Sequence, residues 1–191
     1  RLAKPDSCIY DLGCSTGSLL SPLARSIPDL PGLRLIGIDN SPAMLGKAHE
    51  KLGSFANLVS LVEADLNDSF SFNPACAIVM NYTLQFIAPE GRKSLLEQIY
   101  QSLIPDGGLI LNEKVLSEDE RLRETFVEMH HDFKQGHGYS QMEISKKRDA
   151  LEKILIPWKL SKTKARIHEA GFTTVDVFFT TNNFAGLVAL K

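Results

Sequence analysis

The sequence predicts an α/β domain built on a seven-stranded, mostly parallel sheet. Short apolar runs alternate with amphipathic segments from residue 7 to residue 114, a pattern typical of a parallel sheet covered by helices on both faces. The apolar runs 174–180 and 184–190 are joined by a connection too short for a parallel crossover, which predicts a C-terminal antiparallel hairpin. Residues 117–160 leave this pattern and predict a helical insertion after the fifth strand, serving as a lid or a dimer surface.

The predicted elements follow one another in a simple order. Strands are expected at 7–11, 33–39, 58–62, 75–80 and 109–114, and helices at 18–27, 41–52 and 89–103. Ser41 suits the N-cap of the second helix and Pro42 its first turn. Within the insertion, helices are expected from about residue 117 to 135 and from 140 or 141 to 154. A last helix at 162–170 is closed by Gly171.

Length and composition favour a single domain over residues 1–191. A chain of 191 residues can bury one sizeable core, and its formal charge of −2 predicts neither direct nucleic-acid binding nor attraction to an anionic membrane. The three cysteines are too few and too apolar in context for a disulfide framework, which indicates a reducing, cytoplasmic location. No apolar run approaches a bilayer-spanning length, and no signal peptide is expected ahead of the first strand.

The turn after the first strand carries two glycines with different expected tasks. Gly13 allows a sharp turn and close approach of a ligand, whereas Gly17 permits close packing where a helix begins. Asp39 ends the second strand 39 − 17 = 22 residues after Gly17, where an acidic residue can bind ribose hydroxyls. A turn that uses its glycines for geometry alone would leave Asp39 and Asn40 unexplained, so a nucleoside ligand is predicted.

The details of this turn favour one kind of nucleoside. A dinucleotide site needs a middle glycine at the position that Ser15 occupies, and Asp11 would repel a pyrophosphate. Instead, Asp-Leu-Gly-Cys-Ser-Thr-Gly at 11–17 resembles the first motif of class I S-adenosylmethionine (SAM)-dependent enzymes. Asp11 also suits the ammonium and sulfonium groups of SAM. The turn therefore predicts a SAM-type cofactor rather than NAD, in a Rossmann-like methyltransferase fold.

Polar residues follow four of the predicted strands and should meet at one edge of the sheet, where ligands of such folds bind. Any one of them alone could serve as a helix cap or turn residue, but their common position favours a binding site. The candidate residues are Gly13, Cys14, Ser15, Asp39, Asn40, Asp65, Leu66 and Asn81.

Each candidate has an expected role. The turn from Gly13 to Ser15 should offer backbone groups to the amino acid part of SAM, and Asp39 should accept from both ribose hydroxyls. Asn40 is expected to flank the adenine, while the Asp65 carboxylate and the Leu66 amide bind its polar edge. Asn81 is expected nearest the reacting methyl group.

The insertion contains two further candidate groups. His130, His131 and His137 suggest a metal site, but adjacent histidines on a helix point about 100° apart, so surface or hydrogen-bonding roles are favoured and no metal is expected. Lys146 and Lys147 fit a solvated charge run. Arg148, by contrast, shares a predicted apolar face with residues 144 and 151, and an arginine there requires an anion.

Taken together, these motifs resemble the carboxy-S-adenosylmethionine synthase family over essentially the whole chain. The resemblance is carried by Asp-Leu-Gly-Cys-Ser at 11–15, Asn-Tyr-Thr-Leu-Gln-Phe at 81–86, Met-His-His-Asp-Phe-Lys at 129–134, and segments 38–44, 138–140, 143–145, 147–148, 164–166 and 184–191. It implies a bacterial cytoplasmic homodimer that converts SAM and prephenate into carboxy-SAM and phenylpyruvate. A partner enzyme then uses carboxy-SAM to carboxymethylate the wobble uridine of tRNA.

The resemblance also implies site residues and a mechanism. The family's ligand contacts fall on the eight rim candidates and on Arg148, which would bind the new carboxylate of carboxy-SAM bidentately. A further family contact, a tyrosine of a segment ahead of the first strand, has no counterpart in this sequence. The implied chemistry is capture of carbon dioxide by a sulfonium ylide, for which the protein mainly supplies proximity and a dry cavity. An ordinary SAM-dependent methyltransferase and a non-catalytic SAM-binding module are the alternatives.

Overall fold

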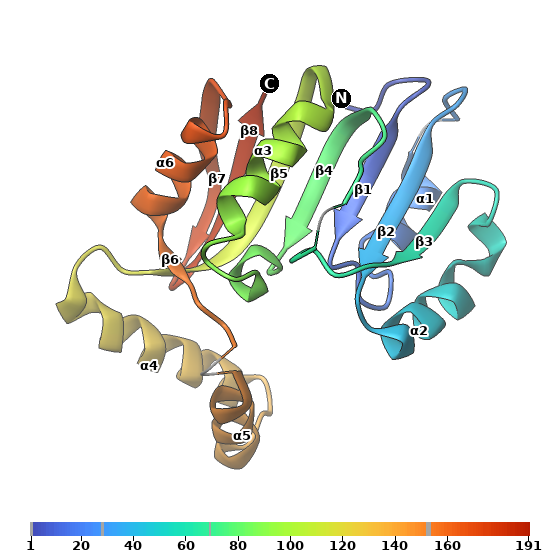
Figure 1. The fold of residues 1–191 in the computed structure, drawn as a ribbon. Helices are drawn as coiled ribbons and strands as arrows, with labels where there is room; N and C mark the ends of the chain where they lie inside the picture. Colours follow the sequence, from blue (N-terminus) through green and yellow to red (C-terminus); the bar gives the residue numbers. More distant parts are fainter. Residues whose placement is uncertain (1, 28, 69, 152–153) are drawn as a thin grey trace.

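The computed structural model describes residues 2–27, 29–68, 70–151 and 154–191, except for the side chains at 144 and 147–150. Its sheet has the strand order β3-β2-β1-β4-β5-β8-β7 (Figure 1). Neighbours from β3 to β5 are parallel, and β8 is antiparallel to both β5 and β7. The strands are β1 Cys8–Leu12, β2 Arg34–Asp39, β3 Val59–Glu63, β4 Ala75–Asn81, β5 Leu103–Leu116, β7 Thr174–Thr181 and β8 Phe184–Leu190. The predicted seven-stranded sheet with a C-terminal hairpin is confirmed.

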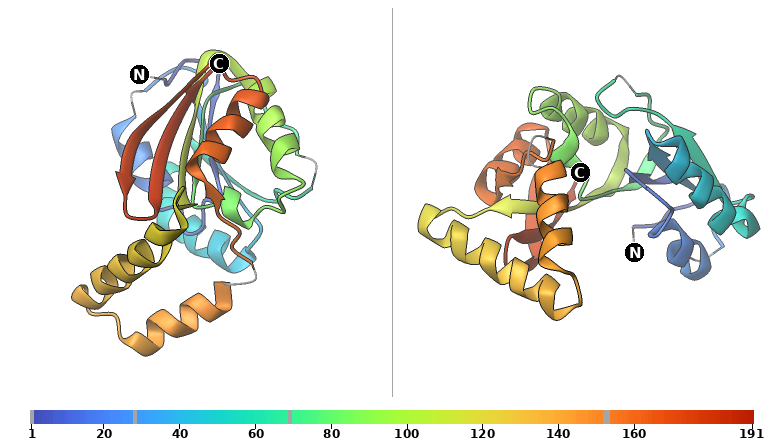
Figure 2. Two further views of the ribbon diagram at one scale, coloured as in Figure 1. Left: turned by 90° about the vertical axis from the view of Figure 1, so that its left-hand side faces the viewer. Right: turned by 90° about the horizontal axis from the view of Figure 1, so that it is seen from below.

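Helices cover both faces of the sheet, as Figures 1 and 2 show. The helices α1 (Leu20–Ser26) and α2 (Pro42–Leu52) lie on one face, while α3 (Arg92–Ser102) and α6 (Leu160–Glu169) lie on the other. Each face has its own apolar cluster, one with Leu20 and Ala48 at its centre and the other with Leu96 and Ile167. Because β1 and β4 lie between these clusters, nearly all of their residues are buried.

The start of α2 confirms the predicted cap. Ser41 Oγ accepts a hydrogen bond from the Met44 amide at 3.4 Å, and Pro42 is the first helical residue. The other end of the helix packs on the glycine turn, since a Cβ on Gly17 would lie 2.7 Å from Leu52 Cδ1. Gly17 also has a φ of +68°, so both its backbone and its packing require glycine.

Two features of β5 differ from the prediction. The strand begins at Leu103 rather than at residue 109, because Leu103 pairs with Ala75 before the register shifts to pair Gly108 with Ala77. This irregularity bends the chain through Asp106, which has a φ of +61°. At its other end β5 pairs with an unpredicted strand, β6 (Trp158–Lys159), which has only two residues and hence no detectable periodicity.

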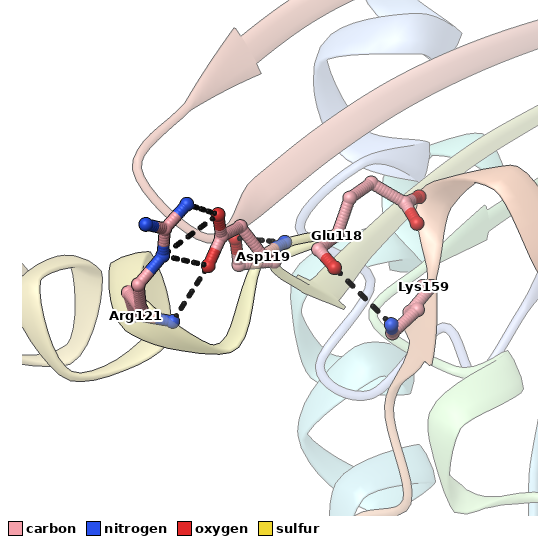
Figure 3. Close-up of polar contacts among 5 residues, drawn as sticks. Glu118, Asp119, Arg121 and Lys159 are labelled. Atoms are coloured by element: carbon pink, nitrogen blue, oxygen red, sulfur yellow. Dashed lines mark hydrogen bonds and ion pairs between the residues drawn. The ribbon is translucent and has the colours of Figure 1, made fainter.

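The predicted insertion is a pair of helices, α4 (Glu120–Gly136) and α5 (Gln141–Leu151), which projects beyond the carboxyl ends of the strands (Figures 1 and 2). Its base is closed by contacts between residues far apart in sequence. Lys159 Nζ donates to the Glu118 carbonyl at 3.2 Å (Figure 3), and the Ser161 amide donates to the Glu118 carboxylate at 3.0 Å. Asp119 caps α4 by accepting from the Arg121 amide. These contacts at the base of the insertion chiefly fix the orientation of the two helices.

Candidate functional site

A cavity of about 320 Å³ opens at the carboxyl ends of β1, β2, β3 and β4. The order of the sheet reverses between β1 and β4, and this is where α/β sheets bind their ligands. Thirteen residues line the cavity: Gly13, Ser15, Asp39, Asn40, Ala64, Asp65, Leu66, Asn67, Asn81, Tyr82, Thr83, Phe86 and Ile87. Seven of the nine sequence candidates are among them.

The floor of the cavity is formed by the turn after β1. Gly13 has a φ of +76°, and a Cβ there would lie 2.4 Å from Thr83 Oγ1. The Thr83 hydroxyl donates to the Leu12 carbonyl at 2.7 Å, which ties the loop after β4 to the end of β1. The amides of Gly13 and Cys14 both donate to the Ile38 carbonyl, at 2.8 and 2.9 Å. Glycine is therefore required at position 13 to let two loops meet at the cavity.

Asp39 is held in position by backbone amides. Its Oδ2 accepts from the Ser15 amide at 2.8 Å and its Oδ1 accepts from the Ser41 amide at 2.9 Å. Each carboxylate oxygen can accept two hydrogen bonds, so both remain able to bind a further hydroxyl. The Ser15 amide, expected to face a ligand, is committed to Asp39 instead, and Ser15 adopts a φ of +48° to make that bond.

A second carboxylate stands across the cavity at the end of β3. Asp65 Oδ1 accepts from the Asn67 amide at 2.9 Å and from Asn67 Nδ2 at 2.8 Å. These bonds, with a smaller one from Asn40, hold the pKa of Asp65 below its usual value. Among the described residues nothing accepts a hydrogen bond from the Leu66 amide, although the Leu66 side chain is buried. A carboxylate acceptor and an amide donor thus lie side by side.

The loop after β4 forms the opposite wall. Asn81 Oδ1 accepts from Asn112 Nδ2 at 2.7 Å, and the Tyr82 amide donates to the Asn112 carbonyl at 2.7 Å. The Tyr82 ring packs edge-on against Phe184 with centroids 5.7 Å apart, and Phe184 lies 5.0 Å from the His130 ring of α4. A line of rings therefore connects the cavity to the insertion.

Two buried ionisable residues beneath this loop, Glu113 and Arg92, were not anticipated from the sequence. Glu113 accepts from the Leu84 amide at 2.8 Å and from the Gln85 amide at 3.2 Å, so it caps the short helix η2 (Leu84–Phe86). Burial nevertheless raises the pKa of Glu113 to about 8, partly opposed by these amides and by Arg92. The available signal was a carboxylate within the apolar strand 109–114.

Arg92 completes the support of this loop. It is 1% exposed and donates to the carbonyls of Ile87 at 2.8 Å, Gln85 at 3.2 Å and Ile156 at 2.8 Å. Its guanidinium also stacks on Trp158, 4.5 Å from the ring centroid. Arg92 thus joins the cavity loop to the segment that returns from the insertion.

Asp11 lies just below the cavity rather than in its lining. It is 3% exposed within β1, and burial followed by repulsion from Asp39 raises its pKa to about 7. No side-chain hydrogen bond to the Asp11 carboxyl occurs within the part of the chain that the structure describes. A cation bound in the cavity would favour ionisation of this group.

Two of the nine candidates do not line the cavity. The Cys14 thiol is buried and packs over Gly37, and burial with the nearby Asp11 and Asp39 raises its pKa to about 12. Arg148 belongs to α5, but its side chain lies outside the described residues. Six lining residues were not named as candidates: Ala64, Asn67, Tyr82, Thr83, Phe86 and Ile87. All six lie in the segments that follow the predicted strands 58–62 and 75–80, which was the signal that could have identified them.

The histidines of the insertion do not converge. His130 packs on Phe184, whereas His137, just past the end of α4, has its Nδ1 2.8 Å from the Phe133 carbonyl. Within 2–27, 29–68, 70–151 and 154–191 no three histidine, cysteine or carboxylate side chains are grouped so as to hold a metal ion.

Comparison with known proteins identifies the family. Residues 9–107 match the model of a methyltransferase domain. A carboxy-S-adenosyl-L-methionine synthase of Aliivibrio fischeri is 43% identical over 193 residues, which cover 100% of this chain and 79% of that protein. A carboxy-S-adenosyl-L-methionine synthase of Chromohalobacter salexigens is 44% identical over 185 residues, covering 96% and 68% of the two chains. The chain belongs to the carboxy-S-adenosyl-L-methionine synthase family.

Solved structures support the fold of this carboxy-S-adenosyl-L-methionine synthase family member. A SAM-dependent methyltransferase from Aquifex aeolicus superposes with a TM-score of 0.64 at 16% identity, covering 98% of this chain and 83% of that one. Human N-acetylserotonin methyltransferase in complex with SAM gives a TM-score of 0.65 at 20% identity, covering 96% and 47%. The family fold is therefore that of class I methyltransferases, confirming the predicted architecture.

Proposed function

We propose that this protein converts SAM and prephenate into carboxy-SAM and phenylpyruvate. The supporting observation is the extent of the family match. The methyltransferase domain model ends at residue 107, but the similarity to proteins named carboxy-S-adenosyl-L-methionine synthase continues through β5 and the α4–α5 insertion. A shared cofactor fold alone would not require likeness in the insertion.

The cavity fits SAM by its donors and acceptors. Asp39 would accept from the ribose hydroxyls through lone pairs that the Ser15 and Ser41 amides leave open. The Asp65 carboxylate would accept from the adenine amino group, and the Leu66 amide would donate to an adenine ring nitrogen. Gly13 and Ser15 would bound the methionine part, with Asn81 near the methyl group and Asn40 beside the adenine. Any contact of Cys14 with SAM would have to come from the Cys14 backbone, because its thiol is buried.

The proposed reaction balances without an added oxidant or base. Prephenate loses one carboxylate as carbon dioxide and its ring hydroxyl as hydroxide. The cyclohexadiene ring that remains becomes the aromatic ring of phenylpyruvate. The hydroxide takes a proton from the SAM methyl group and leaves as water. The carbon dioxide then bonds to the deprotonated methyl carbon. SAM supplies a positively charged sulfur that stabilises the negative charge developing on the carbon. The protein contributes proximity and exclusion of water.

Mass analysis tests this function directly. Incubation with SAM and prephenate should yield a nucleoside heavier than SAM by one carbon dioxide, together with phenylpyruvate. Recovery of S-adenosylhomocysteine and a methylated acceptor would instead identify an ordinary methyltransferase, and unchanged SAM would indicate a binding module. The matched control omits prephenate.

Arg148 is proposed to bind the carboxylate of carboxy-SAM. The support is the family resemblance and the need of a carboxylate for a bidentate cationic partner. Arg148→Ala should weaken carboxy-SAM binding by about 1.5 to 3 kcal/mol and SAM binding much less. Calorimetry on both ligands measures the difference, with Lys146→Ala in the same helix as the control. Equal losses for the two ligands would remove this role.

A cytoplasmic homodimer is also proposed, supplying carboxy-SAM to a tRNA-modifying enzyme. The cysteines Cys8, Cys14 and Cys76 are free and buried, as in proteins of reducing compartments. Of the helices described, none is long and apolar enough to cross a membrane. Helix α4 carries an exposed apolar stripe that includes Leu122, Met129 and Phe133, which suits a subunit contact.

A further inference from the structure

Lys114 lies near the carboxyl end of β5, on the strand face that supports Asn81. It lies two residues beyond Asn112 on β5, so the side chains of both residues project from the same face. Asn112 Nδ2 donates to Asn81 Oδ1 in the cavity wall. Two strand residues span about 7 Å, which places Lys114 one step outward from the expected position of the reacting methyl group.

Helix α4 brings further basic groups to this place. Arg123, Val127, His130 and Lys134 follow one another at helical spacing and share one face of α4. The His130 ring lies 5.0 Å from Phe184, and Phe184 is the register partner of Lys114 across the β5–β8 pair. Phe184 also packs on Tyr82, which lines the cavity. The basic face of α4 and Lys114 therefore meet beside the cavity mouth.

Within the described part of the chain, two cations of this cluster, Lys114 and Arg123, form no ion pair. Burial, followed by Lys134 and Arg123, lowers the pKa of Lys114. Burial, followed by Lys134, Lys114 and His131, lowers the pKa of His130 to about 4. Among the described residues no carboxylate lies within ion-pair distance of Lys114 or Arg123. A partly buried positive charge such as that of Lys114 is stabilised by a bound anion.

We propose that Lys114, Arg123 and His130 bind a carboxylate of the second substrate. The proposal rests on the proposed function, in which prephenate carries two carboxylates with different fates. One leaves as carbon dioxide and becomes the carboxylate of carboxy-SAM, to which Arg148 is assigned. The other remains on phenylpyruvate and needs a separate cationic partner. At neutral pH His130 is uncharged and donates an N–H, while Lys114 and Arg123 supply the charge.

Steady-state kinetics test the assignment. Lys114→Met keeps the length of the side chain and removes its charge, so the KM for prephenate should rise about ten-fold or more. The dissociation constant of SAM, measured by calorimetry, should stay within about two-fold because Lys114 lies outside the nucleoside part of the site. Lys114→Arg should recover most of the affinity for prephenate. Lys47→Met, on the exposed face of α2, is the matched control.

The outcomes separate this proposal from the proposed function. An unchanged KM for prephenate in Lys114→Met would overturn the anion site while leaving the synthase activity intact. Failure of the wild type to form carboxy-SAM would refute the function, and the site is then decided by titrating malonate into the SAM-loaded protein. A shift of the His130 ring resonances that is lost in Lys114→Met supports a carboxylate site, and its absence in the wild type refutes it.

Discussion

Asp39 is the residue whose geometry most constrains ligand binding. Two backbone amides fix its carboxylate before any ligand arrives, so little side-chain entropy is lost on binding. Asp39→Ala should weaken SAM binding about ten-fold or more, because the ribose loses a charged acceptor. Calorimetry measures the effect, with the exposed Asp29→Ala as the control. Comparable affinities in both variants would show that Asp39 serves only to order the turn.

Asp11 should make stability depend on pH in a defined window. Burial, followed by repulsion from Asp39, raises the pKa of Asp11 in the folded state from 3.8 to about 7. The contribution of Asp11 to the free energy of unfolding is therefore fully present below about pH 4. It is lost as pH rises toward 7, by at most about 1.4 kcal/mol per pH unit. Urea unfolding of the ligand-free protein at several pH values should show this slope in the wild type. In Asp11→Asn the free energy of unfolding should fall less steeply over the same range.

At the level of elements, the position of the loop after β4 depends on the buried side chain of Arg92. Arg92 donates to three carbonyls and stacks on Trp158, so one side chain joins the cavity loop, α3 and β6. Arg92→Met should lower the free energy of unfolding by about 3 kcal/mol or more, because three backbone carbonyls lose their hydrogen-bond donor. Urea unfolding measures the loss. Arg25→Met, on the exposed side of α1, should change stability by less than about 0.5 kcal/mol.

Elements with regular patterns were predicted well from the sequence, and short or irregular ones were not. The capped helix α2 and the hairpin β7–β8 matched because turn chemistry and periodicity specify them locally. The bulged start of β5 and the two-residue β6 depend on partners distant in sequence, Ala75 and Val115, which no local pattern reveals. Elements that form only through strand pairing with distant residues could therefore not be predicted from the sequence.

The candidate site shows the same limit. Asp39, Asp65 and Asn81 were found because strand ends in a parallel sheet meet at one rim. The direction of single side chains could not be predicted, as Cys14 shows by pointing into the core one residue after a cavity-lining glycine. The buried contacts of Arg92 and Glu113 arise from tertiary packing, so an amphipathic pattern alone would place Arg92 in solvent.

Across the whole molecule, rigidity is distributed unevenly. The central strands are buried on both faces, whereas α4 has no fully buried residue and is attached mainly at its base. The cavity thus has a fixed nucleoside side, formed by the sheet, and a second side that depends on the insertion. This division suits an enzyme that holds one substrate firmly and admits a second one.

The exposed apolar surface of the insertion leads to a prediction about assembly. Phe133 is 57% exposed and Met129 47% exposed on one stripe of α4, a costly arrangement for a monomer. Sedimentation velocity should therefore show a dimer, and Phe133→Asp should shift it toward monomer because a buried unpaired charge opposes association. Thr173→Asp adds the same charge in the loop before β7 and should leave the dimer intact. A wild-type monomer at micromolar concentration, or a dimer unaffected by Phe133→Asp, would exclude this stripe as the subunit contact.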